Sequence, residues 1–153
     1  MSRRRVALLD VNVLVALFDP DHIHHEIAHD WFAGQRKSGW ATCPLTENGF
    51  LRTASRVARR REPIPLPTLI AGLRAFIASG HHERWTDDMT LLDEQRFRAS
   101  GVLGHHQLTD VYLLALAVAH KGLLATFDQK IAVEVVKGAR REHLAVLAPA
   151  AAR

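Results

Sequence analysis

Short apolar runs that alternate with helical patterns are the feature that most constrains the fold of this chain. Residues 6–10, 39–43 and 123–127 are apolar runs of the length and composition of buried strands. Segments with apolar residues at helical spacing lie between them. Because parallel strands need helical crossovers, the pattern predicts an α/β fold with a central, mostly parallel sheet of four to five strands flanked by helices.

The remaining elements are predicted from capping residues and periodicity. Thr46 is expected to cap a helix that continues through residue 57, Pro67 opens the next helix, and Thr109 starts a helix that Gly122 ends. Further elements are expected from the same signals: a helix over 24–37, a strand near 83–86, a short helix near 93–99, a helix over 129–137 and an edge strand over 143–148.

Size and composition are those of one compact globular domain. The chain has 153 residues, 48% of them hydrophobic and 24% charged, so we expect a single domain over 1–153. The longest apolar stretch, 111–119, is too short to cross a bilayer, and no signal peptide is expected. The single cysteine, Cys43, suits a reducing cytoplasm, and its apolar neighbours favour a packing role.

The balance of charge is basic. The formal net charge is +4, and arginines cluster at 3–5, 59–61 and 140–141. An isolated cluster of this kind is more often a solvated helix end than a binding site. Beside an acidic catalytic centre, however, such clusters would attract a polyanion such as a phosphate backbone.

Four acidic residues are predicted to meet at one edge of the sheet. Asp10 ends the first strand, and Glu47 follows the Thr46 cap, so both belong to the carboxyl edge, where ligands bind in open parallel sheets. Asp110 opens a helix roughly 18 Å long. The strand that follows returns about 15 Å, which brings Asp128 back to the same edge.

Each of these acids also has a purely structural interpretation. Asp10 can begin a turn, Glu47 and Asp110 can interact with a helix dipole, and Asp128 can cap the last helix. Their common edge favours a site, because independent capping roles do not require four carboxylates in one place. Such carboxylates repel one another, so a cation has to offset them, and a set of oxygen ligands suits Mg²⁺ or Mn²⁺.

The segments around these acids resemble those of PIN-domain proteins, and among them the VapC-type toxins of bacterial toxin-antitoxin pairs. Three stretches carry the resemblance, in matching order and spacing: LLDVNVLVALFDPDHIHHEIAHDWF, CPLTENGFLR and TDVYLLALAVAHKGLLATFDQKIA. Residues 58–100 contribute little. The resemblance implies that the acidic ligands are Asp10, Glu47, Asp110 and Asp128, and that Asn12 and Thr126 orient the site.

For a member of that family the implied activity is endonucleolytic cleavage of RNA with Mg²⁺ or Mn²⁺, with one or two ions. The basic clusters, including Arg59, Arg60 and Arg61, would then hold the RNA backbone. The family also implies a homodimer and a cognate antitoxin that inserts a segment into a groove near the site. The helices at 46–60 and 67–79 are our candidates for that groove.

Three other interpretations compete with this one. His25 and His29 lie four residues apart, as zinc ligands can, but no third ligand has convincing spacing. A phosphatase of the haloacid-dehalogenase kind needs a second Asp two residues after the first, where this chain has Asn12. A non-catalytic RNA-binding module would not need all four acids. Trp31 and Trp40 are expected in the core rather than as base-stacking platforms.

Overall fold

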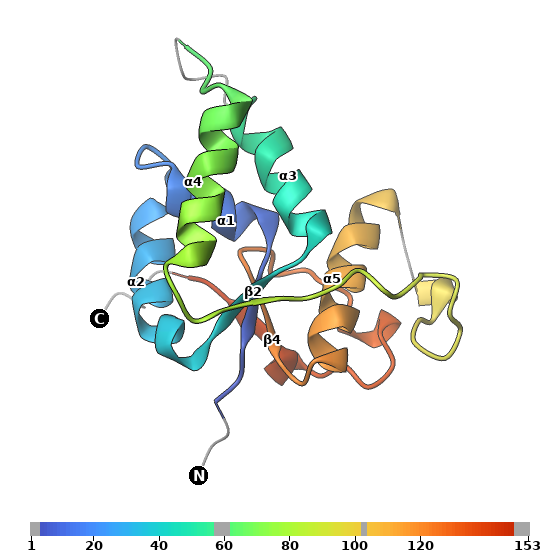
Figure 1. Ribbon diagram of the computed structural model, residues 1–153. Helices are drawn as coiled ribbons and strands as arrows, with labels where there is room; N and C mark the ends of the chain where they lie inside the picture. Colours follow the sequence, from blue (N-terminus) through green and yellow to red (C-terminus); the bar gives the residue numbers. More distant parts are fainter. Residues whose placement is uncertain (1–3, 57–61, 102–103, 149–153) are drawn as a thin grey trace.

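A five-stranded, all-parallel sheet forms the centre of the molecule (Figure 1). A computed structural model describes residues 4–56, 62–101 and 104–148. The strands lie in the order β3-β2-β1-β4-β5. Their bounds are Ala7–Leu9 for β1, Trp40–Thr42 for β2, His82–Arg84 for β3, Leu123–Thr126 for β4 and Leu144–Val146 for β5. The predicted α/β class and the parallel sheet are confirmed.

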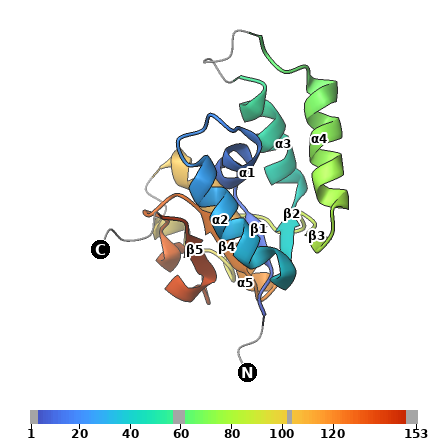
Figure 2. The same cartoon turned by 90° about the vertical axis from the view of Figure 1, so that its left-hand side faces the viewer.

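Helices cover both faces of this sheet. They are α1 (Val11–Phe18), α2 (His25–Gln35), α3 (Pro44–Ala54), α4 (Leu66–Ala78) and α5 (Leu108–Ala119). One core holds α5 and the apolar residues of 131–136, and the other holds α1 and α2 with parts of α3 and α4. Figures 1 and 2 show α3 and α4 side by side, projecting beyond the carboxyl edge of the sheet.

Alternation along the strands explains the two cores. Leu8 and Leu124 face the α5 side, whereas Leu9 and Ala125 face the α1 side, as the two-residue period of a strand requires. Trp40 is fully buried, and Trp31 packs against the same core, so both tryptophans belong to the interior as expected. None of the helices in the described ranges has the length and apolar character needed to cross a membrane.

The order of strands reverses between β1 and β4, and this reversal positions the site. From β1 the chain proceeds outward through β2 and β3 on one side, and through β4 and β5 on the other. The carboxyl ends of β1 and β4 therefore lie where the strand order reverses, which is the position at which open parallel sheets bind ligands. Leu9 pairs with Ala125, and the Asp10 N–H donates to the Ala125 carbonyl at 2.9 Å.

The predicted starts of α3 and α5 are wrong, by three residues and by one residue respectively. α3 begins at Pro44 with Cys43 at its N-cap, and Thr46 instead occupies the third helical position, where its Oγ1 accepts from the Cys43 N–H at 3.0 Å. α5 begins at Leu108 because a 3₁₀ turn at His105–Gln107 leads directly into it, ahead of Thr109. Cys43 is fully buried, in agreement with a packing role.

Two predicted helices are absent. Residues 93–99 form turns followed by a 3₁₀ turn, and residues 129–137 contain only the 3₁₀ turn Val133–Val135. The two segments bind each other instead: the Arg98 N–H donates to the Val135 carbonyl at 2.7 Å, and the Lys137 N–H donates to the Arg96 carbonyl at 2.9 Å. These pairings satisfy backbone groups that a helix would have satisfied locally.

Candidate active site

Asp10 is the central acid of the site. It caps α1, and its two carboxylate oxygens accept separate hydrogen bonds, from the Val11 N–H at 2.7 Å and from the Thr126 hydroxyl at 2.7 Å. Its side chain is almost entirely buried, with a residue exposure of 6%. Burial raises the pKa of Asp10, while the hydrogen bonds from Thr126 and Val11 act in the opposite direction.

Thr126 and Asn12 connect Asp10 to Asp128. The Thr126 hydroxyl donates to Asp10 and accepts from the Asp128 N–H at 3.1 Å and from Asn12 Nδ2 at 3.4 Å. The Asn12 carbonyl oxygen accepts from the Phe127 N–H at 3.4 Å. One buried hydroxyl therefore links the end of β1 to the loop after β4, which is the arrangement expected of residues that orient a site.

Asp110 and Asp128 complete a group of three interacting aspartates. Asp110 lies in the first turn of α5, and its pKa is raised to about 7, first by burial and then by the charge of Asp10 and by the hydrogen bond and charge of Asp128. Asp128 also accepts from the Lys130 N–H at 2.8 Å, which holds the chain in a turn after β4. Like charges gathered in this way favour a proton or a cation between them.

Glu47 lies near the same edge but is bound elsewhere. Its Oε2 accepts from the Thr42 hydroxyl at 2.7 Å, and its Oε1 accepts from Arg84 Nη2 at 3.0 Å. The charges that raise the pKa values of Asp10 and Asp110 come from the other aspartates. The structure thus brings together three of the four predicted acids and pairs the fourth with an arginine.

The donor set suits a hard cation by its chemistry. Carboxylate oxygens are the ligands that Mg²⁺ and Mn²⁺ prefer, and the charges of Asp10 and Asp128 contribute to the raised pKa of Asp110. Within 4–56, 62–101 and 104–148, no three acidic, His or Cys side chains are already placed as a metal cage. Binding an ion therefore requires some of the carboxylates to turn.

Thr42 and Arg84 contact a predicted site acid but were not expected from the sequence. They are paired in register at the ends of β2 and β3, so both reach the carboxyl edge. A polar residue that ends a strand is the signal that would have found them. The predicted RNA-binding residues Arg59, Arg60 and Arg61 lie outside the described residues.

The histidines considered as zinc ligands have other contacts. His25 Nδ1 is hydrogen-bonded to the Ala16 carbonyl at 2.7 Å, and the His25 and His29 rings lie 4.4 Å apart. His24 stacks on Phe127, the neighbour of Asp128, with ring centroids 4.7 Å apart. The loop before α2 therefore packs beside the acidic site.

Comparison with known proteins places the chain in a family. A model of the PIN domain matches residues 7–137. Ribonuclease VapC44 of Mycobacterium tuberculosis is 47% identical over 141 residues, which covers 92% of this chain and 99% of that protein. Ribonuclease VapC39 of the same organism is 40% identical over 126 residues, 82% of this chain and 91% of that protein.

A solved structure supports the same fold. It is described as VapBC2 from Rickettsia felis bound to a DNA fragment from their promoter. It aligns with a TM-score of 0.52 at 13% identity and covers 85% of this chain and 92% of that chain. At this low identity the solved structure supports only the fold, whereas the sequence matches support membership of a family. The family match over residues 7–137 and the two sequence matches show that the chain belongs to the PIN-domain family and, within it, to the VapC ribonucleases.

Proposed function

We propose that this protein is an Mg²⁺- or Mn²⁺-dependent endoribonuclease and the toxin of a toxin-antitoxin pair. The observation that carries the proposal is the group of three interacting aspartates, in which the Thr126 hydroxyl links Asp10 at the end of β1 to Asp128 after β4, and Asp110 at the start of α5 interacts with both. Relatives that match nearly the whole chain are named ribonucleases. The substrate we propose is the phosphodiester backbone of RNA, with water as the nucleophile.

In this proposal Asp10, Asp110 and Asp128 hold the divalent ion, with Glu47 as a further ligand. The bound ion supplies Lewis acidity and lowers the pKa of a water molecule. The chain supplies position and shielding: Thr126 fixes one oxygen of Asp10, and the capping bond from Val11 fixes the other. Asp110 gives up its proton when it serves as a ligand, which a pKa of about 7 permits at neutral pH.

Incubation of total RNA with the purified protein tests the activity. We expect fragments with Mg²⁺ or Mn²⁺ and intact RNA with EDTA, because the uncompensated carboxylates need the cation. A phosphomonoester is assayed in parallel. Hydrolysis of that compound with intact RNA would favour the phosphatase alternative, and binding of RNA without cleavage under all conditions would favour the non-catalytic module.

Thr126→Val should weaken the site without unfolding the chain. Valine keeps the shape and the strand preference of a fully buried β4 residue but removes the hydroxyl that joins Asp10 to Asp128. Loss of such a partner typically reduces metal affinity or activity about tenfold to a hundredfold. Mn²⁺ titration and RNA cleavage measure the effect. The control is Thr90→Val. It also removes a hydroxyl that accepts from a backbone N–H, but in an exposed turn away from the acids. Equal Mn²⁺ affinity and equal cleavage rates in the two variants would contradict the role of Thr126.

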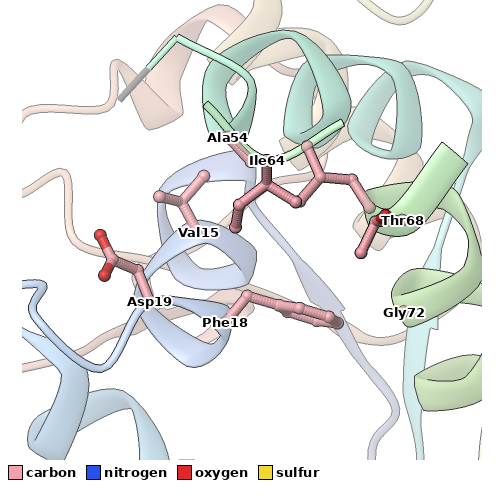
Figure 3. A pocket seen from close by; sticks show the side chains of 8 residues that line it. Val15, Phe18, Asp19, Ala54, Ile64, Thr68 and Gly72 are labelled. Carbon is pink, nitrogen blue, oxygen red and sulfur yellow. The ribbon is translucent and has the colours of Figure 1, made fainter. Parts of the chain in front are cut away.

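A cognate antitoxin is part of the proposal, and an apolar pocket supports it. The pocket has a volume of about 180 Å³ where α1, α3 and α4 meet, and Figure 3 shows Val15, Phe18 and Ile64 around it. Leu66 and Ile70 on α4 are 50% and 39% exposed. These features suit an apolar segment of a partner, as we expect for the groove between the helices at 46–60 and 67–79.

A homodimer, a cytoplasmic location and a single domain over the whole chain complete the proposal. The homodimer follows from the resemblance to VapC-type toxins. The cytoplasmic location rests on the single cysteine of the chain. The single domain is supported by the one sheet that joins elements from both ends of the described chain.

A further inference from the structure

We propose that Arg84 binds a backbone phosphate of the substrate and, in the absence of substrate, holds Glu47 away from the three aspartates. This inference rests on the proposed ribonuclease function. It assigns two linked roles to one arginine: a latch on the fourth acid and a ligand for RNA. We refer to Glu47, Thr42 and Arg84 together as the Glu47 latch.

The latch engages both oxygens of Glu47. Thr42 donates to Oε2 at 2.7 Å, and Arg84 donates to Oε1 at 3.0 Å. Thr42 is fully buried, and its Oγ1 also lies 2.7 Å from His82 Nε2. Because the single hydroxyl proton of Thr42 goes to Glu47, His82 Nε2 is the donor to Thr42. A chain of hydrogen bonds thus fixes the inner oxygen of Glu47, and the arginine fixes the outer one.

Electrostatics explains why Glu47 rests in this position. A fourth carboxylate turned toward the aspartates would add negative charge beside three carboxyl groups that already interact with one another. Pairing with Arg84 avoids that repulsion. A divalent cation among the aspartates reverses the preference, because Glu47 then gains a second positive partner. Arg84 and the cation therefore compete for the same carboxylate.

The outer half of the latch is open to replacement. The Glu47 side chain is only 13% exposed, whereas that of Arg84 is 59% exposed, so the guanidinium faces solvent while it holds the acid. Ion pairs exposed to this degree are weak, because water and salt screen them. A competing anion can draw Arg84 away without moving α3 or the end of β3.

A groove beside the latch points to a phosphate as that anion. Arg84 and Arg74 both line a pocket of about 210 Å³ between α3, α4 and β3, together with Asn48, Glu47 and four apolar side chains of α3 and α4. Guanidinium groups bind phosphate oxygens with two parallel hydrogen bonds, and Asn48 adds an amide donor. A strand of RNA that enters this groove would engage Arg84 and free Glu47 at the same time. Substrate binding and completion of the acidic site are thereby coupled.

Arg84→Gln separates the two roles in the full-length protein. Without RNA, we expect Mn²⁺ to bind this variant more tightly than the wild type, by about three- to tenfold in a calorimetric titration, because Glu47 is no longer held by a cation. With EDTA to prevent cleavage, we expect single-stranded RNA to bind about tenfold more weakly, with a salt dependence reduced by about one phosphate contact.

The matched control is Arg96→Gln. Arg96 is also an exposed arginine paired with an acid, Asp93, at 3.4 Å, but it lies in the segment that pairs with residues 135–137 and does not line the groove beside the latch. This variant should bind Mn²⁺ and RNA like the wild type. Circular dichroism and melting temperature establish that both variants fold. The double variant Arg84→Gln, Glu47→Gln should lose the gain in Mn²⁺ affinity, since the freed ligand is removed.

Clear results would overturn the inference. An unchanged or lower Mn²⁺ affinity in folded Arg84→Gln contradicts the latch, and an unchanged RNA affinity contradicts the phosphate contact. If the wild type cleaves RNA with a metal while Arg84→Gln behaves like Arg96→Gln, only this inference fails. If the wild type neither binds Mn²⁺ nor cleaves RNA, the proposed function itself fails.

Discussion

Replacement of Asp10 by Asn is expected to reduce RNA cleavage by about a thousandfold or more, equivalent to about 4 kcal/mol of transition-state stabilisation. Asp10 is the acid that the fold holds most firmly, with one oxygen on the Val11 N–H and the other on the Thr126 hydroxyl. Asparagine has the same shape but only one acceptor oxygen and no charge. The variant therefore keeps the α1 cap and loses a charged ligand.

The measurement is the initial rate of cleavage of a labelled RNA with saturating Mg²⁺. Asp30→Asn makes the same chemical change on the exposed side of α2 and should retain the wild-type rate. Melting temperatures show whether each variant is folded. A folded Asp10→Asn protein that keeps a tenth or more of the wild-type rate would remove Asp10 from the catalytic set.

Replacement of Asp110 by Asn should make the metal-free protein more stable at pH 8. The pKa of Asp110 is raised from 3.8 to about 7, so the folded state binds more protons than the unfolded state between these values. Stability therefore falls as pH rises from about 4 to 7, and the loss is complete at pH 8. Asparagine mimics the protonated form, and its amide can still donate to Asp128.

Allowing for the partial exposure of Asp110, we expect a gain of about 1 to 2 kcal/mol, or about 3 to 6 °C in melting temperature. At pH 4 the two proteins should melt together, because the wild-type carboxyl is then protonated. At pH 8 with Mg²⁺ the wild type should recover, since the cation offsets the charges. A variant that melts below the wild type at pH 8 without metal would contradict this account of the site.

The central part of the fold follows from local signals in the sequence. The runs at 6–10, 39–43 and 123–127 are buried strands of the central sheet, because continuous apolar runs between helical patterns have few other stable arrangements. Three of the four acids also interact as the strand and helix lengths predict. The reason is geometric, since parallel crossovers bring strand ends and helix starts to one edge.

The orientation of Glu47 could not be predicted in the same way. A cap at Thr46 would put Glu47 at the first helical position, whereas the start of α3 at Pro44 puts it a full turn into the helix. Its partner Arg84 comes from a strand 37 positions later, and only the register of β2 with β3 brings the two together. The mutual pairing of 96–98 with 135–137 is equally invisible to local patterns.

The hydroxyl of Thr126 has a consequence for how members of this family can diverge. It ties Asp10 and Asp128 together using only the two innermost strands and the turns that follow them. The described residues of the long connection from β3 to α5, 85–101 and 104–107, take no part in those bonds. Insertions, deletions and new side chains can accumulate in that connection while the cleavage activity is preserved. The choice of target RNA can therefore evolve independently of the cleavage activity.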